Sequence, residues 1–423
     1  MCKGEISVVF GRKVIKLRKL KQSVVLRSNE TLNFFEEKLF SRKEIRYLKS
    51  NKIKEEKIYF RVPKIFSFIE NPDEAFDFIK NTFKCRYEEK EILLDISQCE
   101  EIGMCALFIF DYILLMILDE KEQNQTIWYN FSNNEKINKF FIDAGISGYI
   151  DNDSDNFKEE RKRLKEVKLK LLKTKMGNNG KTNKLIRLLL KTQKIDSIIN
   201  LEQKIREFLD DCLNDFGYYL NELGERVIEK IVSEWISNCK NHLKSFCEYY
   251  CAGSLNYEDE NGNCNLVLVN FGDTIPESIN KEDTTEMGKD TFKSITSLQE
   301  YNKDFTKNNG IVLAAMQKRV SRLKTETNTR GTGFPEIMSF FSQLSDDEKN
   351  SKMTIISGKT QIKFAKSDFK RYNKDRNIFF NESCDPRKKP SRENVINMKN
   401  EFPGTLISIK FIFKKDYIEK INI

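Results

Sequence analysis

Histidine is the scarcest residue in the 423-residue sequence, which contains only His242. A single imidazole cannot build a His-rich metal cluster or a Cys₂His₂ zinc finger. It also leaves almost no room for separate phosphoacceptor and catalytic histidines. Proline is scarce too, with 7 residues, well below the usual ~5% of a chain. We therefore expect few long coil linkers.

Zinc-type cysteine pairs and long apolar segments are also missing. None of the ten cysteines forms a Cys-x₂-Cys pair, and the closest spacing is Cys247-x₃-Cys251. This usage is typical of reduced thiols rather than a disulfide framework. The longest apolar run, 102–118, contains Asp111 and is slightly too short to span a bilayer. The sequence after Met1 is mixed and polar rather than an apolar signal-peptide core, so we expect a cytoplasmic protein without membrane contact.

Aromatic residues are abundant and charge is nearly balanced. The 32 Phe and 14 Tyr can supply a core, which argues against disorder throughout. The 73 Lys and Arg against 64 Asp and Glu give a net charge of +9, too mild an excess to indicate nucleic acid by itself. Composition and pattern divide the chain into a basic N-terminal region at 1–56, an α/β domain at 57–150, a basic linker at 151–196 and a second domain at 197–423.

Strands and helices alternate in residues 57–150. The pattern predicts strands at 57–63, 91–96 and 126–131, and helices at 72–84, 102–118 and 136–144. This alternation is typical of an α/β layer fold.

Two motifs in this domain resemble the STAS family, which includes the anti-anti-sigma factors. They are Leu94-Asp95-Ile96-Ser97 and the run Ile102-Gly103-Met104-Cys105-Ala106-Leu107 before an apolar helix. The resemblance implies a domain that contacts a protein partner. The family usually carries an Asp-Ser-Ser-Gly turn whose serine is phosphorylated. Here Gly103-Met104-Cys105-Ala106 occupies that place, and it offers no hydroxyl.

The linker is strongly basic between residues 158 and 194, with fourteen Lys and Arg against three Glu. No aromatic residues are interspersed, so base stacking is not indicated. We interpret the stretch as solvated helix and linker. The alternative is an electrostatic patch for nucleic acid or another acidic partner.

The second domain carries three polar motifs in order. After an amphipathic helix at 202–221, a helix at 225–250 contains Glu234-x₃-Asn238-x₂-Asn241-His242, in which positions i, i+4 and i+8 share one stripe. A strand at 265–271 runs into Asn270-Phe271-Gly272-Asp273-Thr274. Arg330-Gly331-Thr332-Gly333 then opens a helix that extends through Phe341. Glycines before a helix allow backbone N–H groups to meet phosphate oxygens.

In this order the motifs resemble the GHKL ATPase fold of gyrase, heat-shock chaperones, sensor histidine kinases and mismatch-repair ATPases. The resemblance implies a Bergerat-type α/β sandwich that binds ATP and Mg²⁺. Glu234 would be the general base and Asn238 the Mg²⁺ ligand, with Asn241 and His242 near the phosphates.

The resemblance also assigns the two loops. Asn270, Gly272 and Thr274 would contact the nucleotide, although the family usually has Asp in place of Asn270 and Gly in place of Thr274. Arg330, Gly331, Thr332 and Gly333 match the second glycine box. A polar stretch at 279–329, with a helix predicted at 310–322, stands where the family has its ATP lid. The remaining features are a basic, loop-like insertion at 364–395 and a closing strand at 404–413.

These resemblances favour a slowly hydrolysing Mg·ATP switch joined to a STAS-like interaction domain. The pairing is associated with bacterial stress signalling or anti-phage defence. The alternatives are a protein Ser/Thr kinase of the anti-sigma-factor type and a nucleotide-sensing adaptor that does not turn over. A homodimer is also an open alternative.

Overall fold

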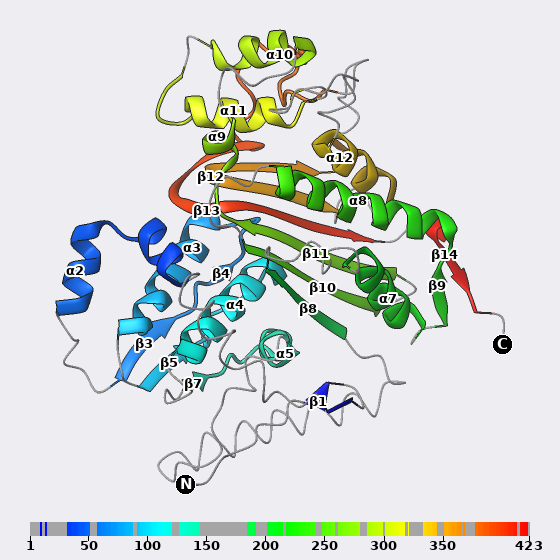
Figure 1. Ribbon diagram of the computed structural model, residues 1–423. Coiled ribbons are helices and arrows are strands. Elements are labelled where there is room, and N and C mark those ends of the chain that lie inside the picture. The colour runs from blue at the N-terminus through cyan, green and yellow to red at the C-terminus, as the bar shows by residue number, and fades with distance from the viewer. Residues whose placement is uncertain are drawn as a thin grey trace.

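The computed structural model describes much of both predicted domains and little of the linker between them. The described residues are 9–10, 13–14, 32–50, 57–87, 91–120, 127–143, 184–191, 201–214, 217–241, 248–258, 261–279, 286–298, 301–317, 320, 333–344, 351–365, 367–368, 377–412 and 415–421. Within them the chain is a mixed α/β protein (Figure 1). None of the described helices is long and apolar enough to cross a membrane.

The elements expected within residues 57–150 are confirmed to within two residues at each end. The strands are β3 (Lys57–Arg61), β5 (Glu91–Asp95) and β7 (Ile127–Asn130), and the helices are α3 (Pro72–Phe83), α4 (Met104–Glu120) and α5 (Glu135–Asp143). The strands form a parallel sheet in the order β3-β5-β7. A short parallel pair, β4 (Ile65–Phe66) and β6 (Glu101–Ile102), lies beside them.

A second, antiparallel sheet has the order β12-β13-β11-β10-β8. Its strands are β8 (Lys184–Lys191), β10 (Glu248–Glu258), β11 (Asn261–Phe271), β12 (Lys352–Ala365) and β13 (Val395–Ile412). The interpretation of 151–196 as linker is therefore wrong for β8, which pairs with β10 along its whole length. The pairing is non-local, so the charge pattern of the segment gave no sign of it. Strand β13 also begins nine residues before the closing strand predicted at 404–413.

Helices cover one face of this sheet, which we call the helix face (Figure 1). They include α7 (Leu201–Asn214), α8 (Glu222–Asn241), α11 (Lys307–Ala315) and α12 (Gly333–Leu344). Their apolar side chains share a core with alternate sheet residues such as Leu268, Ile355 and Ile407.

Two predicted helices of this layer end earlier than expected. Helix α7 stops at Asn214, and Gly217 turns the chain with φ +81° into β9 (Tyr218–Leu220), which pairs with β14 (Ile418–Lys420). Helix α8 stops at Asn241, and Glu248 already belongs to β10. The aromatic run around Tyr249 pairs between two strands, which a helical reading of the local pattern misses.

The opposite face of the antiparallel sheet is covered by α3 and α4 of the N-terminal part. Val267, Val269 and Phe271 of β11 join the same core as α4. Helix α4 is apolar around its circumference because it lies between the two sheets, as Figure 1 shows. The expectation of two separate domains is thus wrong at this point, since residues 57–150 and the antiparallel sheet share one core.

Polar contacts border this shared core. Gln361 of β12 donates from Nε2 to the carbonyl oxygen of Phe68 at 2.7 Å. Asn400 of β13 donates its backbone N–H to Oδ1 of Asp73 at the start of α3, at 3.0 Å. The N-terminal part is therefore fixed on the sheet by directional bonds as well as by packing.

Gly404 allows β13 to pass close to β11. Its φ is +135°, and a Cβ at this position would lie 2.0 Å from the carbonyl oxygen of Asn270. We expect Gly404→Ala to lower the free energy of unfolding by at least ~3 kcal/mol, because backbone strain and overpacking add. Gly217→Ala, where φ is +81° and nothing lies within 4 Å, should cost about 1 kcal/mol. Urea unfolding of both variants measures the difference, and equal losses would contradict the close approach.

Candidate functional site

The candidate site begins at the end of β11. Asn270 is the last residue but one of this strand, is 9% exposed, and pairs in register with Thr405 of β13. Strand alternation places Asn270 on the same side as Leu268, which is the helix face. Thr405 lies 2.9 Å from the hydroxyl of Ser357 on β12, Oγ1 to Oγ. The helix face therefore ends in a small polar group at this edge of the sheet.

The turn after Asn270 is held by hydrogen bonds within the turn and to strands β12 and β13. The N–H of Gly272 donates to the carbonyl oxygen of Pro403 at 3.3 Å. Thr274 caps α9 (Ile275–Ser278): its Oγ1 accepts from the N–H of Glu277 at 3.3 Å, and its N–H donates to Glu277 Oε2 at 2.8 Å. The N–H of Ile275 donates to Ser357 Oγ at 2.8 Å. Thr274, predicted to contact nucleotide, thus has a helix-capping role that glycine could not fill.

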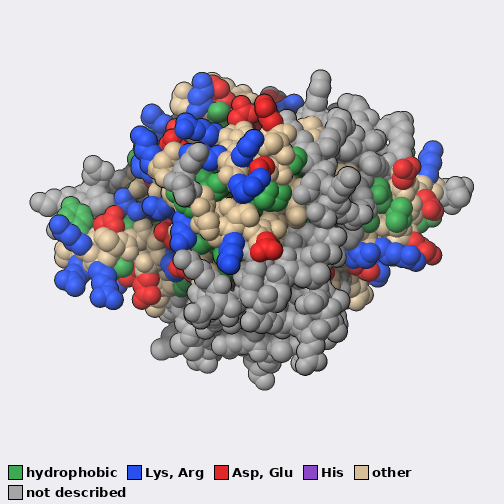
Figure 2. Space-filling model, turned by 90° about the horizontal axis from the view of Figure 1, so that it is seen from above, with side chains coloured by type: hydrophobic (Ala, Val, Ile, Leu, Met, Phe, Trp, Pro, Cys, Tyr) green, Lys and Arg blue, Asp and Glu red, His purple; other side chains and the backbone are tan. Residues whose placement is uncertain are grey.

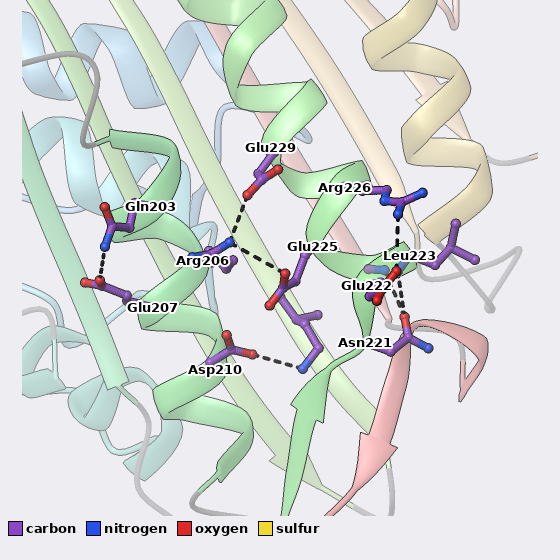
Figure 3. A network of polar contacts seen from close by, with 12 residues as sticks. Gln203, Arg206, Glu207, Asp210, Asn221, Glu222, Leu223, Glu225, Arg226 and Glu229 are labelled. Atoms are coloured by element: carbon purple, nitrogen blue, oxygen red, sulfur yellow. Dashed lines mark hydrogen bonds and ion pairs between the residues drawn. The ribbon is translucent and has the colours of Figure 1, made fainter.

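Helix α8 is anchored at its beginning, as Figure 3 shows. Asn221 Oδ1 accepts from the backbone N–H of Leu223 at 3.1 Å, which caps the helix. Arg206 of α7 lies 3.1 Å from Glu229 and 3.5 Å from Glu225 (Figure 3). These contacts fix the direction in which α8 runs from the two-stranded β9–β14 sheet.

The second half of α8 carries the predicted catalytic residues. The helix has 20 residues and is about 30 Å long, comparable with the strands that it crosses. Figure 1 shows it running from β9 and β14 toward the end of the sheet where α9 lies. Glu234 is half-buried. Asn238 and Asn241 belong to the last two turns of the helix, whereas their side chains, and His242, lie outside the described residues.

Helix α12 begins at Gly333 and packs beside α8. Its Ile337, Met338 and Phe341 are fully buried in the core of the helix face. Arg330, Gly331 and Thr332 lie outside the described residues. The structure therefore brings α8, α12 and the end of β11 onto one face. It does not describe the side chains expected to meet phosphate.

The segment expected to act as a lid is in part firmly attached. It contains α10 (Glu286–Thr296) and α11, which replaces the helix predicted at 310–322. Asn309 of α11 donates from Nδ2 to Thr360 Oγ1 at 2.9 Å. Gln317 exchanges two hydrogen bonds of 2.9 Å with the backbone of Ile378, in the insertion. Helix α11 is thus fixed to β12 and to the insertion.

Sequence reasoning missed a polar cluster around Asp95, where the strands of the parallel sheet end. Asp95 is 2% exposed and accepts hydrogen bonds from the Tyr59 hydroxyl, Arg61 Nε at 3.2 Å, Asn130 Nδ2 at 2.9 Å and the Ser97 N–H at 3.1 Å. Burial alone would raise the pKa of this carboxyl, but the bonds from Ser97, Tyr59 and Arg61 outweigh it and lower the pKa to about 2. The sequence feature that could have indicated this cluster is Asp95 itself, an acidic residue at the end of the apolar strand β5.

Comparisons with known proteins gave no relative for this chain. No protein-family model, no curated protein and no solved structure matches it. Among the described residues, no group of three or more His, Cys, Asp and Glu could hold a metal ion.

The lowered pKa of Asp95 makes stability depend on pH. The folded pKa of about 2 lies below the ordinary 3.8, so the contribution is fully present above about pH 5 and is lost as pH falls through the folded value. The difference corresponds to about 2 kcal/mol. We expect Asp95→Asn to be less stable than the wild type by about that amount at pH 7, with the gap closing toward pH 2. Urea unfolding at several pH values tests this, and a gap that stays constant would contradict it.

Proposed function

We propose that this chain binds ATP with Mg²⁺ on the helix face and hydrolyses it slowly, as a switch. One observation carries the proposal. Helix α8, which bears Glu234, Asn238 and Asn241, crosses the sheet face to which Asn270 points. A carboxylate, carboxamides and a buried strand-end amide at one end of one face suit a purine nucleotide with a phosphate chain.

The end of β11 would hold the base. The side-chain oxygen of Asn270 would accept from the amino group of adenine, and the hydroxyl of Thr405 stands opposite in register. Both residues lie at the rim of a buried core, where a hydrogen bond is stronger than in water. The bonds that Ser357 makes to Thr405 and Ile275 would keep this edge rigid.

Helix α8 would serve the phosphate end. Asn238 would offer its carbonyl oxygen to Mg²⁺, an ion that takes one or two protein ligands and otherwise phosphate and water. When bound, the ion would neutralise phosphate charge. Glu234, half-buried on the same helix, would orient the attacking water and accept its proton.

A route from this site to the N-terminal part supports the switch. Phe271 follows Asn270 directly and points to the opposite face of the sheet, where its ring lies 4.7 Å from that of Phe35 and 5.3 Å from that of Tyr112. Lys38 also lies 2.8 Å from Glu277 of the α9 cap. A displacement of the end of β11 would therefore change the packing of the STAS-like part. We propose that this part contacts a protein partner.

The test is equilibrium binding of ATP with Mg²⁺, together with phosphate release, for the wild type and Glu234→Ala. We expect both proteins to bind, and we expect Glu234→Ala to release phosphate about 10²–10⁴-fold more slowly, the usual contribution of a general base. Glu222→Ala, at an exposed position in the first turn of the same helix, is the matched control and should keep wild-type rates. Absence of ATP binding by the wild type would overturn the proposal.

A further inference from the structure

Helix α2 (Arg42–Ser50) lies on the surface of the molecule, and only one side of it meets the core. None of its side chains is buried, and Tyr47 is 65% exposed. The helix is nevertheless well formed, because Ser41 and Glu44 cap it reciprocally: the Ser41 N–H donates to Glu44 Oε2 at 2.7 Å, and the Glu44 N–H donates to Ser41 Oγ at 3.2 Å. Figure 1 shows α2 beside the N-terminal layer at the left edge of the molecule.

The outward side of α2 is basic. Ile45 and Leu48 pack against the core, whereas Arg42, Lys43 and Arg46 are exposed. Figure 2 shows Lys and Arg side chains gathered at the same left edge. We call Arg42, Lys43 and Arg46 the α2 basic face.

No described carboxylate forms an ion pair with the α2 basic face. The acidic groups nearby interact elsewhere: Glu36 pairs with Lys49 and Arg86 at 2.7 and 2.8 Å, and Glu44 lies 4.0 Å from Lys80. Glu37 is exposed one turn before the helix. Three adjacent cations thus remain without a neutralising partner among the described side chains.

We propose that the α2 basic face binds the phosphate backbone of duplex DNA without reading its bases. Arg42 and Arg46 are one turn apart, about 6 Å along the helix, and each DNA strand carries a phosphate every ~3.4 Å of its axis. A surface helix about 10–12 Å wide fits between the phosphates that border the major groove of B-DNA, whereas the major groove of duplex RNA is deep and too narrow to admit it.

The neighbouring aromatics favour a duplex over a single strand. Single-strand binding needs a row of exposed rings. Tyr47 is exposed here, but the ring of Phe40 is buried and covered by the Lys80 ammonium, 5.1 Å from its centroid. This part of the chain therefore offers charge rather than a stacking surface. The inference stands independently of nucleotide binding on the helix face.

The experiment is fluorescence anisotropy with the full chain and a labelled 20-base-pair duplex of mixed sequence, from 50 to 200 mM salt. Three neutralised phosphates predict a salt slope of about −2.7, or about 40-fold weaker binding across this range. Arg42→Ala/Arg46→Ala should make the slope shallower by about 1.8. Circular dichroism should show an unchanged fold, because both side chains are exposed.

The control is Lys359→Ala/Lys388→Ala, which removes the same charge at two exposed lysines, one on β12 and one in the insertion, and should leave duplex binding unchanged. Equal weakening by both double variants would overturn the proposal, as would the absence of duplex binding by the wild type. Tighter binding to a matched single strand, or to a polyglutamate peptide, would also overturn it.

Discussion

The antiparallel sheet must be covered on both faces, and most of the structure depends on this. Leu268 and Val269 are neighbours in β11, and each is fully buried against a different core. Helices α7, α8, α11 and α12 cover one side, and α3 and α4 cover the other. A strand that is apolar on both sides cannot leave either side to water without losing about 25 cal/mol for each Å² of apolar surface exposed. The N-terminal α/β part therefore completes the core of the antiparallel sheet.

The nucleotide site that we propose would lie at the end of β11, where the helix face of the sheet is no longer apolar. At the end of β11 the helix face turns polar with Asn270, while Phe271 remains in the core of the other face. Asn270 thus belongs to the proposed site, while its neighbour Phe271 packs between the sheet and the N-terminal layer. A conformational signal would need no long pathway, because a displacement of the strand end moves both side chains together.

The sequence predicted the elements that have local signatures. Residues 57–150 alternate short apolar runs with amphipathic helices, and their boundaries were readable because each element has its own periodicity. The end of the strand at Phe271 and the helix that begins at Gly333 could also be predicted, from the turn residues beside them. The capping role of Thr274 could have been read from Thr274-Ile275-Pro276-Glu277, which is the Ser/Thr-x-x-Glu pattern.

The remainder depended on partners distant in sequence. Strand β8 is defined by its pairing with β10, and the aromatic start of β10 continues a helical pattern unless that pairing is known. The shared core could not be predicted for the same reason. The apolar residues all around α4 indicate that the helix is buried, but they do not show that the antiparallel sheet buries it. The exposed basic side of α2 could not be predicted either, because the sequence of a charged helix does not show which of its charges will be paired.

Cooperative unfolding of the two layers tests the shared core most directly. The sequence has two tryptophans, Trp128 on β7 and Trp235 on α8, so Trp235→Phe and Trp128→Phe each leave one reporter. In each variant we expect the tryptophan fluorescence and the far-ultraviolet circular dichroism to change at the same urea concentration. A Trp128 signal that changes at a clearly different urea concentration from the helices would show that the N-terminal layer unfolds alone, and it would contradict this account.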